Sequence, residues 1–477
     1  MHIRAFARRN REPEQRGDEP TLDGLRTETS VATPSHGLPA SWVRGIRSFY
    51  DDLHAEPGVP RACGGTACRF AGVRVESHPI YCLGRCYEAP AHENRPAAPI
   101  PRTSLAPRPV VLRHLLGAAG AEPADADAFA DYALPDGEAI LAAVEASGLR
   151  GRGGAAFPTA RKWRAARETP APDRYVVCNG DEGDPGAYID RLLLEEAPHD
   201  VVAGMLACAR AIGAKRGVLF IRGEYPVAAE RARAAVDEAR ARGLLGDFEV
   251  QVLRGAGSYV AGEETALLRA IEGLRAEPWV KPPYPAERGL DDLPTVVQNV
   301  ETLAVVPHLV RTGAKGNAKA LSLSGAIRRP GVVEIELGTP LRQVLEDAGG
   351  GAPPGRPWKM ALVGGPMGRV VPVADFDVAL DYDTLPGMGH GGIVLLDERV
   401  SARTLAEHLF EFAAAESCGN CAPCRIGTAQ LASRRDREDL ERLMDTLEIG
   451  SLCGFGQGVP RPLRDLLAAF PQELFPC

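Results

Sequence analysis

Ser417-Cys418-Gly419-Asn420-Cys421-Ala422-Pro423-Cys424-Arg425 is the stretch that decides how this sequence is interpreted, together with Cys453 in Ser451-Leu452-Cys453-Gly454. Three thiols at C-x2-C-x2-C spacing converge on one side of a small inorganic core, and a remote fourth thiol completes the ligand set of a [4Fe-4S] cluster. A structural zinc site, the first alternative, more often uses two separated C-x2-C pairs. Disulfides are the least favoured alternative, because a large chain without a signal peptide indicates a reducing compartment. We therefore predict a [4Fe-4S] cluster at Cys418, Cys421, Cys424 and Cys453.

Length, charge and hydropathy exclude several classes of protein. The chain has 477 residues, which is too long for one ordinary domain. Its net charge of -8, with both signs mixed along the sequence, gives no basic surface for nucleic acid. No apolar run reaches the roughly 20 residues needed to cross a bilayer, so direct membrane insertion is not expected. The arginine-rich start lacks the apolar core of a secretory signal, which predicts a disordered tail over residues 1–40 and a cytoplasmic protein.

A second group of cysteines lies in residues 41–100. Cys63-Gly-Gly-Thr-Ala-Cys68 and Cys82-Leu-Gly-Arg-Cys86 place four thiols in short glycine-containing loops. The glycines let the backbone approach sulfur and offer it N–H groups, so the pattern favours a [2Fe-2S] cluster. A small zinc ribbon is the alternative. The proline-rich residues 89–109 that follow are predicted to be a linker.

The next segment has the composition of a phosphate-binding loop. Gly151-Arg152-Gly153-Gly154-Ala-Ala-Phe157 leads into a helix expected over residues 160–167, so backbone amides and a helix N-terminus can face an anion. A tight turn without a ligand is the alternative. Arg150, Arg161 and Lys162 in the same loop favour the phosphate interpretation.

Polar residues follow a predicted buried strand at residues 174–178. These residues, Asn179-Gly-Asp181-Glu182-Gly-Asp184, lie where ligands bind in open α/β sheets, at the carboxyl end of a parallel strand. Asn179, Asp181 and Glu182 are candidates to bond a flavin ring and its ribityl hydroxyls. Their alternative role is an Asx-turn and a helix cap.

A helical pattern ends at Gly148, and after the strand at 174–178 further strands are expected at 217–221 and 248–253, with a helix at 226–241 between them. This alternation predicts a parallel sheet covered by helices over residues 110–315. Cys178 and Cys208 have no neighbours at metal-binding spacing and are expected to be small buried hydrophobic residues. A second glycine-rich turn, Gly255 to Thr265, contains Tyr259, Gly262, Glu263 and Glu264. The loop Trp279-Val-Lys281-Pro-Pro-Tyr284 presents a lysine and an aromatic ring on a stiff proline frame. Residues 318–398 are strand-like with Gly/Pro turns and predict a small α+β module, and residues 400–477 are helical.

With these residues assembled, the chain resembles the flavin subunit of NADH-oxidising and NAD-reducing complexes. This family includes the flavoprotein of respiratory complex I, the diaphorase subunit of NAD-reducing hydrogenases and the beta subunit of NAD-linked formate dehydrogenases. The resemblance implies FMN and NAD(H) as cofactors and an α/β fold with a Rossmann-like FMN domain, a ubiquitin-like β-grasp module and a C-terminal helical bundle. The FMN positions that it implies are Gly151, Arg152, Gly153, Gly154, Lys162, Asn179, Asp181, Glu182, Gly262, Glu263, Gln298 and Asn299. The dinucleotide positions are Phe157, Lys162, Asp184, Glu264, Lys281 and Tyr284, with Tyr259 as a further cofactor-binding candidate.

Three stretches are most similar to formate dehydrogenase beta subunits: residues 374–382, Gly389-His-Gly-Gly-Ile393 and Cys424-Arg-Ile-Gly427. The N-terminal cysteine pairs resemble a thioredoxin-like [2Fe-2S] domain, but Cys68 and Cys82 are far closer than in that domain, which leaves two alternatives: an abbreviated fold or loss of the cluster. Ala156, Asp184 and Ala165 also depart from usual family residues, in the flavin loop and around the dinucleotide.

The expected chemistry is hydride transfer between NAD(H) and FMN, with Glu182 and Lys281 as the candidate catalytic residues. The partner implied is a molybdenum- or tungsten-containing formate dehydrogenase alpha subunit in a multi-subunit oxidoreductase. A hydrogenase diaphorase and the complex I flavoprotein are alternatives that share this chemistry. A non-catalytic iron–sulfur scaffold or sensor is the alternative of another class.

Overall fold

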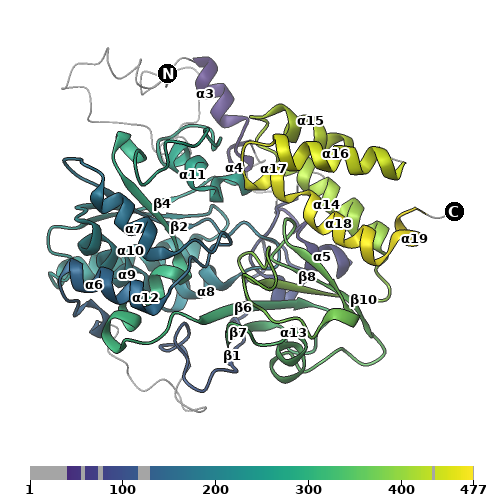
Figure 1. Ribbon diagram of the computed structural model, residues 1–477, viewed down its shortest axis with the longest axis horizontal. Helices are drawn as coiled ribbons and strands as arrows, with labels where there is room; N and C mark the ends of the chain where they lie inside the picture. The colour runs from purple at the N-terminus through teal and green to yellow at the C-terminus, as the bar shows by residue number, and fades with distance from the viewer. Residues whose placement is uncertain (1–39, 55–59, 73–78, 117–128, 432–435, 476–477) are drawn as a thin grey trace.

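The computed structural model describes residues 40–54, 60–72, 79–116, 129–431 and 436–475. The tail predicted for residues 1–40 therefore lies outside the described residues, except for Ala40. Figure 1 shows a unit of strands and helices on one side, a second sheet on the other, and a group of helices at the C-terminal end. No helix among the described residues is long and apolar enough to cross a membrane.

The first unit is built on a parallel sheet with the strand order β4-β3-β2-β5. Its strands are rich in Val, Ile and Leu, which is typical of strands covered on both faces. The strands predicted near residues 174–178, 217–221 and 248–253 are confirmed, while the fourth had not been predicted as a strand. Their bounds are β2 (Tyr175–Gly180), β3 (Arg216–Ile221), β4 (Glu249–Arg254) and β5 (Thr295–Asn299).

Helices cover this sheet, and side-chain caps fix where several of them begin. Asp136 accepts a hydrogen bond from the Ala139 N–H, and Asn299 accepts one from the Thr302 N–H. A left-handed glycine, Gly148, ends the first helix as the sequence predicts. The helices are α6 (Gly137–Ser147), α7 (Thr159–Glu168), α8 (Ile189–Glu196), α9 (Pro198–Ile212), α10 (Pro226–Ala241), α11 (Glu264–Ile271) and α12 (Val300–Thr312).

The second sheet is mixed and has the order β1-β7-β6-β10-β8-β9. Its first strand comes from the segment predicted as a linker and pairs in parallel with β7, so this segment is tied to the β-grasp module. A short helix, α13 (Leu341–Gln343), continues into a π-helical turn at Val344–Ala348. The strands are β1 (Arg102–Ser104), β6 (Ala318–Gly325), β7 (Gly331–Glu336), β8 (Trp358–Val363), β9 (Arg369–Pro372) and β10 (Gly392–Asp397).

A buried ion pair joins a helix of the first unit to the second sheet. The Lys319 Nζ atom, on β6, lies 2.5 Å from a carboxylate oxygen of Glu301, on α12, and both side chains are fully buried. The second Glu301 oxygen accepts a hydrogen bond from the Ala320 N–H. Because a buried charge is stable only when it is paired, this contact fixes how the β-grasp module lies against the first unit.

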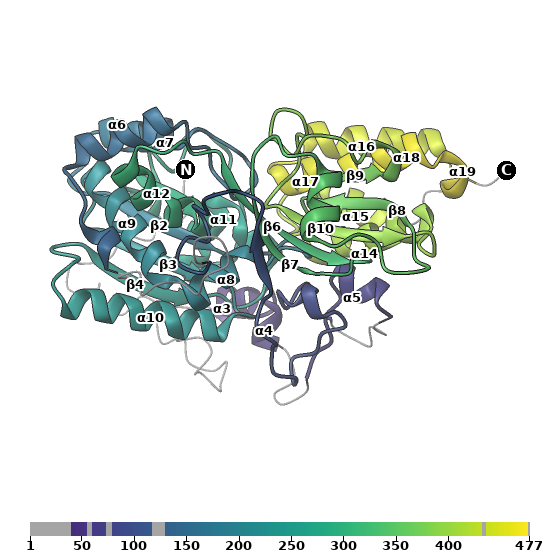
Figure 2. The ribbon, with the colours of Figure 1, turned by 90° about the horizontal axis from the view of Figure 1, so that it is seen from below.

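The C-terminal helices pack beside the second sheet, as Figures 1 and 2 both show. Arg369 on β9 forms an ion pair with Asp465, and Lys359 on β8 forms one with Glu473. The helices are α14 (Ala402–Glu416), α15 (Ala422–Leu431), α16 (Arg437–Gly450), α17 (Gly454–Gly458), α18 (Pro460–Ala469) and α19 (Pro471–Leu474).

The N-terminal segment lies where these units meet (Figure 2). The Tyr50 hydroxyl donates to the Leu274 carbonyl at 2.6 Å, and Thr66 lies 3.1 Å from the His408 ring on α14. The segment contains α3 (Ala40–Arg47), α4 (Asp51–His54), α5 (Thr66–Phe70) and a 3-10 turn at Cys86–Glu88. It therefore contacts the parallel sheet unit and the C-terminal helices at the same time.

Candidate functional site

The predicted polar residues after β2 lie together at the carboxyl end of the parallel sheet. Asn179 donates to the Gly262 carbonyl at 2.8 Å and accepts from the Asp181 N–H at 3.1 Å. The Asp181 Oδ2 atom is buried and has no hydrogen-bond partner among the residues that the structure describes. Burial raises the pKa of Asp181 to about 8. An orphaned buried acceptor is costly, so this position fits a ligand that brings a hydroxyl or amide donor.

The glycine-rich loop presents backbone to the same edge. A Cβ atom at Gly153 would lie 3.0 Å from the Asn299 Cβ, and Gly154 adopts a φ of +112° that other residues rarely take. The loop is closed by a hydrogen bond from the Gly151 N–H to the Phe157 carbonyl at 2.9 Å. Gly154 is thus required for the backbone conformation of the loop, and Gly153 is required for the close approach of the loop to the end of β5.

The arginines of this loop hold the loop itself. Arg150 donates to the Ala156 carbonyl and pairs with Asp383 at 2.9 Å. Arg152 is 1% exposed, donates to the Gly316 carbonyl and lies over the Tyr382 ring. Both guanidinium groups thus anchor the loop to its neighbours. The Nε and Nη1 atoms of Arg152 are buried without a hydrogen-bond partner among the described residues, and phosphate binding by the loop stays a prediction.

Glu182 caps the helix that follows it. Its carboxylate accepts hydrogen bonds from the N–H groups of Ile189 at 2.7 Å, Asp190 at 3.0 Å and Arg191 at 3.1 Å. The Tyr225 hydroxyl donates to the same carboxylate at 3.2 Å. The side chain is fully buried, and burial together with the nearby Asp190 raises its pKa to about 7. The carboxylate thus caps the N-terminus of α8, close to the carboxyl end of β2.

One residue at this edge was not among the predicted site residues. His390, on the loop before β10, lies 3.1 Å from Asp190 Oδ2 through its Nε2 atom and 3.6 Å from Glu182. Asn299 donates to the same Asp190 oxygen at 2.7 Å. The histidine lies far from the other site residues in sequence, and only the Gly-His-Gly-Gly pattern singled it out.

Four charged side chains alternate in sign at the mouth of the site. The Lys162 Nζ atom lies 3.1 Å from Glu264, and the Lys281 Nζ atom lies 3.0 Å from Glu264 and 2.9 Å from Glu263. Glu263 also caps α11 through the N–H groups of Thr265 and Ala266. The lysines lower the pKa of Glu264 against the effect of burial. Both lysines are about a quarter exposed, so they are accessible to an anionic ligand.

Two aromatic rings are exposed beside this network. Phe157 is 46% exposed and Tyr284 is 53% exposed. The Arg161 guanidinium lies 5.5 Å from the centre of the Phe157 ring. Exposed rings on a rigid loop are suited to stacking against a flat heterocycle.

Asp184 and Tyr259 connect this edge to the C-terminal helices. The Tyr259 hydroxyl donates to the Asp184 carboxylate, whose pKa is raised by burial. The Tyr259 ring packs against Phe412 on α14 and Phe455 on α17. Asp184 is therefore half-buried and held by Tyr259, in contrast to the exposed Phe157 and Tyr284.

The C-terminal cysteines lie close enough that the thiols of Cys418, Cys421 and Cys453 influence that of Cys424, and their role as cluster ligands stays a prediction. Burial, with smaller contributions from nearby charges and thiols, raises the pKa of Cys424 to about 12 and that of Cys453 to about 11. The sulfur of Cys453 accepts hydrogen bonds from the N–H groups of Phe455 and Gly456, and the sulfur of Cys421 accepts one from Leu452 at 3.5 Å. Backbone donors to sulfur stabilise thiolates and their clusters, so this donor set fits an iron–sulfur centre.

The four N-terminal cysteines also converge, and each is at most 2% exposed. The Cys82 and Cys86 sulfurs are 3.3 Å apart, and the Cys63 thiol contacts both Cys68 and Cys82. The Gly84 N–H donates to the Cys82 sulfur at 3.2 Å, and the Gly186 N–H donates to the Cys86 sulfur. Gly186 belongs to the loop after β2, so these thiols adjoin the carboxyl edge of the parallel sheet. Cys178 and Cys208 are single buried cysteines, as predicted.

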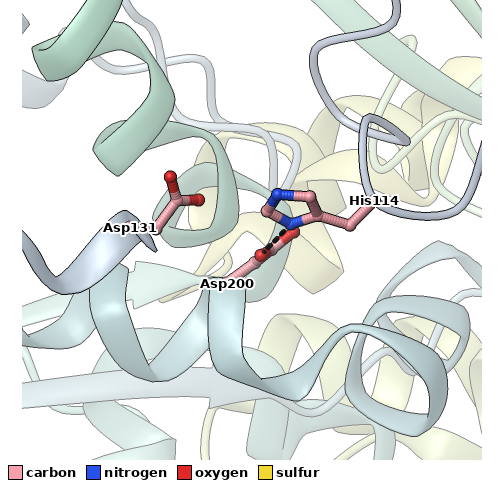
Figure 3. A group of neighbouring side chains, drawn as sticks. All are labelled: His114, Asp131 and Asp200. Atoms are coloured by element: carbon pink, nitrogen blue, oxygen red, sulfur yellow. Dashed lines mark hydrogen bonds and ion pairs between the residues drawn. The ribbon is translucent and has the colours of Figure 1, made fainter. Parts of the chain in front are cut away.

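Another cluster of acidic and histidine side chains lies away from this edge. Figure 3 shows that the His114 ring points toward Asp200, at 2.6 Å, with Asp131 beside them. Arg113 pairs with both carboxylates, and Arg311 pairs with Asp131. The two guanidinium groups balance the two carboxylates, so the cluster is an ion-pair network that ties residues 110–116 to α9 and α12.

Three family models match the chain. They are the Nuo51 FMN-binding domain over residues 144–308, the SLBB domain over residues 322–371 and the NADH-ubiquinone oxidoreductase-F iron-sulfur binding region over residues 404–475. The fold and site thus define a flavoprotein that binds a pyridine nucleotide and an iron–sulfur cluster.

Similar proteins narrow the class further. The chain is 43% identical to the NADP-reducing hydrogenase subunit HndC of Solidesulfovibrio fructosivorans, over 70% of this chain and 75% of the relative. It is 39% identical to an NADH-quinone oxidoreductase subunit of Rhizobium meliloti (strain 1021), over 76% of this chain and 96% of the relative. A crystal structure of an NAD+-reducing [NiFe]-hydrogenase in the H2-reduced state matches with a TM-score of 0.81 and 30% identity, covering 98% of this chain and 91% of the other.

The chain belongs to the family of NADH-binding flavin subunits found in complex I and in NAD-reducing hydrogenases. It is an NAD-dependent oxidoreductase subunit with FMN and a [4Fe-4S] cluster, and its relatives are subunits of larger complexes. The predicted fold class is confirmed. These matches do not support the alternative of a non-catalytic iron–sulfur scaffold or sensor.

Proposed function

We propose that this chain is the NAD(H)-exchanging beta subunit of a formate dehydrogenase and that the residues described above hold its cofactors. One observation carries the choice of parent complex. The Gly389-His390-Gly391 loop, part of a stretch similar to formate dehydrogenase subunits, closes the edge of the site at Asp190.

The flavin would be held by the carboxyl edge of the parallel sheet. Asp181 offers an unpartnered buried oxygen, and Gly153 and Gly154 leave room for a close backbone approach. Asn179 fixes the turn that leads to Asp181 and ties it to Gly262. FMN, when bound, supplies the exchange between a hydride and single electrons. The buried carboxyls around it keep water away from the reacting edge and determine where protons reside.

The dinucleotide would be held at the mouth of the same edge. Lys162 and Lys281 place two cations within reach of an anionic diphosphate, and Glu264 between them can accept from ribose hydroxyls. Phe157 and Tyr284 offer exposed rings for stacking. Lys281 is also the candidate to offset charge during hydride transfer.

Cys418, Cys421, Cys424 and Cys453 would ligate the [4Fe-4S] cluster, and Cys63, Cys68, Cys82 and Cys86 a [2Fe-2S] cluster. The latter assignment is supported by the burial of all four thiols and by the backbone donors at Cys82 and Cys86. The sequence offers no molybdopterin site, so formate oxidation is assigned to an alpha subunit that contains molybdenum or tungsten.

A hydrogenase diaphorase is the second candidate. It is favoured by the match to the NAD+-reducing [NiFe]-hydrogenase chain, which extends over 98% of this chain and so includes the N-terminal cysteines.

Purification of the native complex separates the two candidates. Co-purified molybdenum or tungsten with formate-dependent NAD+ reduction would support the proposal. Nickel with hydrogen-dependent NAD+ reduction would contradict it and support the second candidate. The role of Glu182 is tested separately, because Glu182→Gln is expected to retain FMN and slow flavin reduction by NADH in stopped flow. An unchanged rate would remove Glu182 from the mechanism.

A further inference from the structure

His390 reaches from the β-grasp module into the parallel sheet unit. It lies between two glycines in left-handed conformations, Gly389 with a φ of +61° and Gly391 with a φ of +95°. Such a turn lets the backbone run close to the flavin loop, because a Cβ built on Gly154 would lie 3.6 Å from Gly389. The His390 side chain is 8% exposed and is therefore an internal group.

The backbone and the ring of His390 bind different acidic residues. Its N–H donates to the Asp184 carboxylate. Its Nε2 atom lies 3.1 Å from Asp190 and 3.6 Å from Glu182. The Asp190 oxygen that faces the ring also accepts from Asn299 at 2.7 Å, while the other Asp190 oxygen has no hydrogen-bond partner in the described part of the chain.

The charges around His390 are predominantly negative. Asp184, Glu182 and Asp190 face it from the loop after β2 and from α8. The nearby cation, Lys319, is already paired with Glu301 at 2.5 Å. Burial opposes a charge on the ring, but Asp190 and Glu182 outweigh this effect and raise the pKa of His390 to about 9. At neutral pH the ring is therefore the counter-charge that lets two buried carboxylates lie side by side.

We propose that His390 is a positioning residue of the flavin site: as an imidazolium it orients Asp190 and, through it, Asn299, and thereby holds the sheet edge in the shape that binds FMN. This inference rests on the proposed placement of FMN at that edge. The β-grasp module then contributes to flavin affinity through one loop, although the flavin residues predicted from the sequence all belong to the other unit.

The test is FMN binding by the flavin-depleted full chain between pH 6.5 and 9.5, followed by flavin fluorescence. For the wild type we expect tight binding up to about pH 8.5 and weaker binding as pH rises through 9, because loss of the His390 proton leaves Glu182 and Asp190 unbalanced. For His390→Asn we expect at least about tenfold weaker binding at pH 7 and no such pH transition, where tenfold corresponds to about 1.4 kcal/mol.

A matched control is His199→Asn. His199 on α9 also lies 3.1 Å from a carboxylate, that of Glu238, and its other contacts in the described ranges are with Phe129 and Tyr132, away from the sheet edge. This variant should bind FMN as the wild type does at every pH. His390→Ala provides a second variant, in which added imidazole should restore part of the FMN affinity by refilling the space of the ring.

The possible results distinguish a failure of the proposed role of His390 from a failure of the proposed FMN site. If His390→Asn binds FMN within twofold of the wild-type affinity and shows the same loss of affinity above pH 9, the role of His390 is overturned but the flavin site is not. A wild type that binds no FMN at any pH would overturn the flavin site and the inference with it. If the His390 variants do not fold, as judged by circular dichroism, a wild-type affinity that is flat from pH 8 to 9.5 would still contradict the proposed role.

Discussion

Glu182→Gln provides the sharpest test of how the site is built, because the structure gives Glu182 a mechanical role in addition to its proposed role in the chemistry. Its two oxygens together accept four hydrogen bonds, from three N–H groups at the start of α8 and from the Tyr225 hydroxyl. Glutamine has nearly the same shape but keeps only one accepting oxygen. The substitution therefore leaves the volume unchanged and removes acceptors.

The magnitude follows from these contacts. If the glutamine oxygen keeps the bonds to Ile189 and Asp190, its amide NH2 faces the Arg191 N–H, and a buried donor without a partner costs roughly 1–3 kcal/mol. Loss of a carboxylate at a helix N-terminus adds roughly 0.3–2 kcal/mol. We expect a total of roughly 2–4 kcal/mol, which lowers the melting temperature by roughly 5–15 °C for a unit of this size.

The assay is thermal unfolding of the flavin-free full chain at pH 8, where the Glu182 carboxyl, with a pKa of about 7, is mostly ionised. The control is Glu196→Gln on the same helix, which removes only a partly exposed ion pair with Arg102 and should cost less than about 1 kcal/mol. Equal melting temperatures for the two variants would refute the assignment of Glu182 as the cap that begins α8.

Three further outcomes follow from the structure. Asp181→Asn should weaken FMN binding about tenfold, as measured by isothermal titration. The melting temperature of the flavin-free protein at pH 7 should change little, because the pKa of about 8 already keeps the Asp181 carboxyl mostly neutral at that pH. Lys319→Met should destabilise the chain by about 3–5 kcal/mol by leaving Glu301 charged and unpaired, and Glu301→Gln in the same chain should recover part of the loss. Burial raises the pKa of Glu416 from 4.5 to about 8. The contribution of this carboxyl to the free energy of unfolding is therefore fully present below about pH 4.5 and is lost as pH rises to 8. Between pH 5 and 8.5, the melting temperature should fall less in Glu416→Gln than in the wild type.

Much of the fold could be predicted because local signals agree with the tertiary structure. The alternating strands and helices from Tyr175 to Ala241 carry clear periodicity and glycine or proline boundaries, and they appear close to their expected limits. β1 escaped prediction because three residues in a proline-rich segment show no periodicity, and only pairing with distant β7 makes them a strand. β5 was not predicted as a strand because its buried run is short and leads directly into α12.

The ligand roles of the glycines and cysteines stay predictions, but the glycine-rich loop and the grouping of the thiols were predictable from residue type and spacing alone. Side chains whose role depends on a distant partner were not. Arg150 and Arg152 have the composition of a phosphate site, yet their partners Asp383 and Tyr382 lie more than two hundred residues away. His390 is the opposite case, since only the approach of the β-grasp module to Asp190 gives it a role.

The central claim is that the carboxyl edge of the parallel sheet binds FMN where NAD(H) can reach it. Anaerobic addition of NADH to the full chain reconstituted with FMN and iron–sulfur clusters, followed by visible absorption, tests it most directly. We expect the flavin band to bleach in proportion to added NADH, and we expect this bleaching to be lost in Asp181→Asn at FMN concentrations that saturate only the wild type. A wild-type flavin band that excess NADH leaves unchanged would contradict this claim.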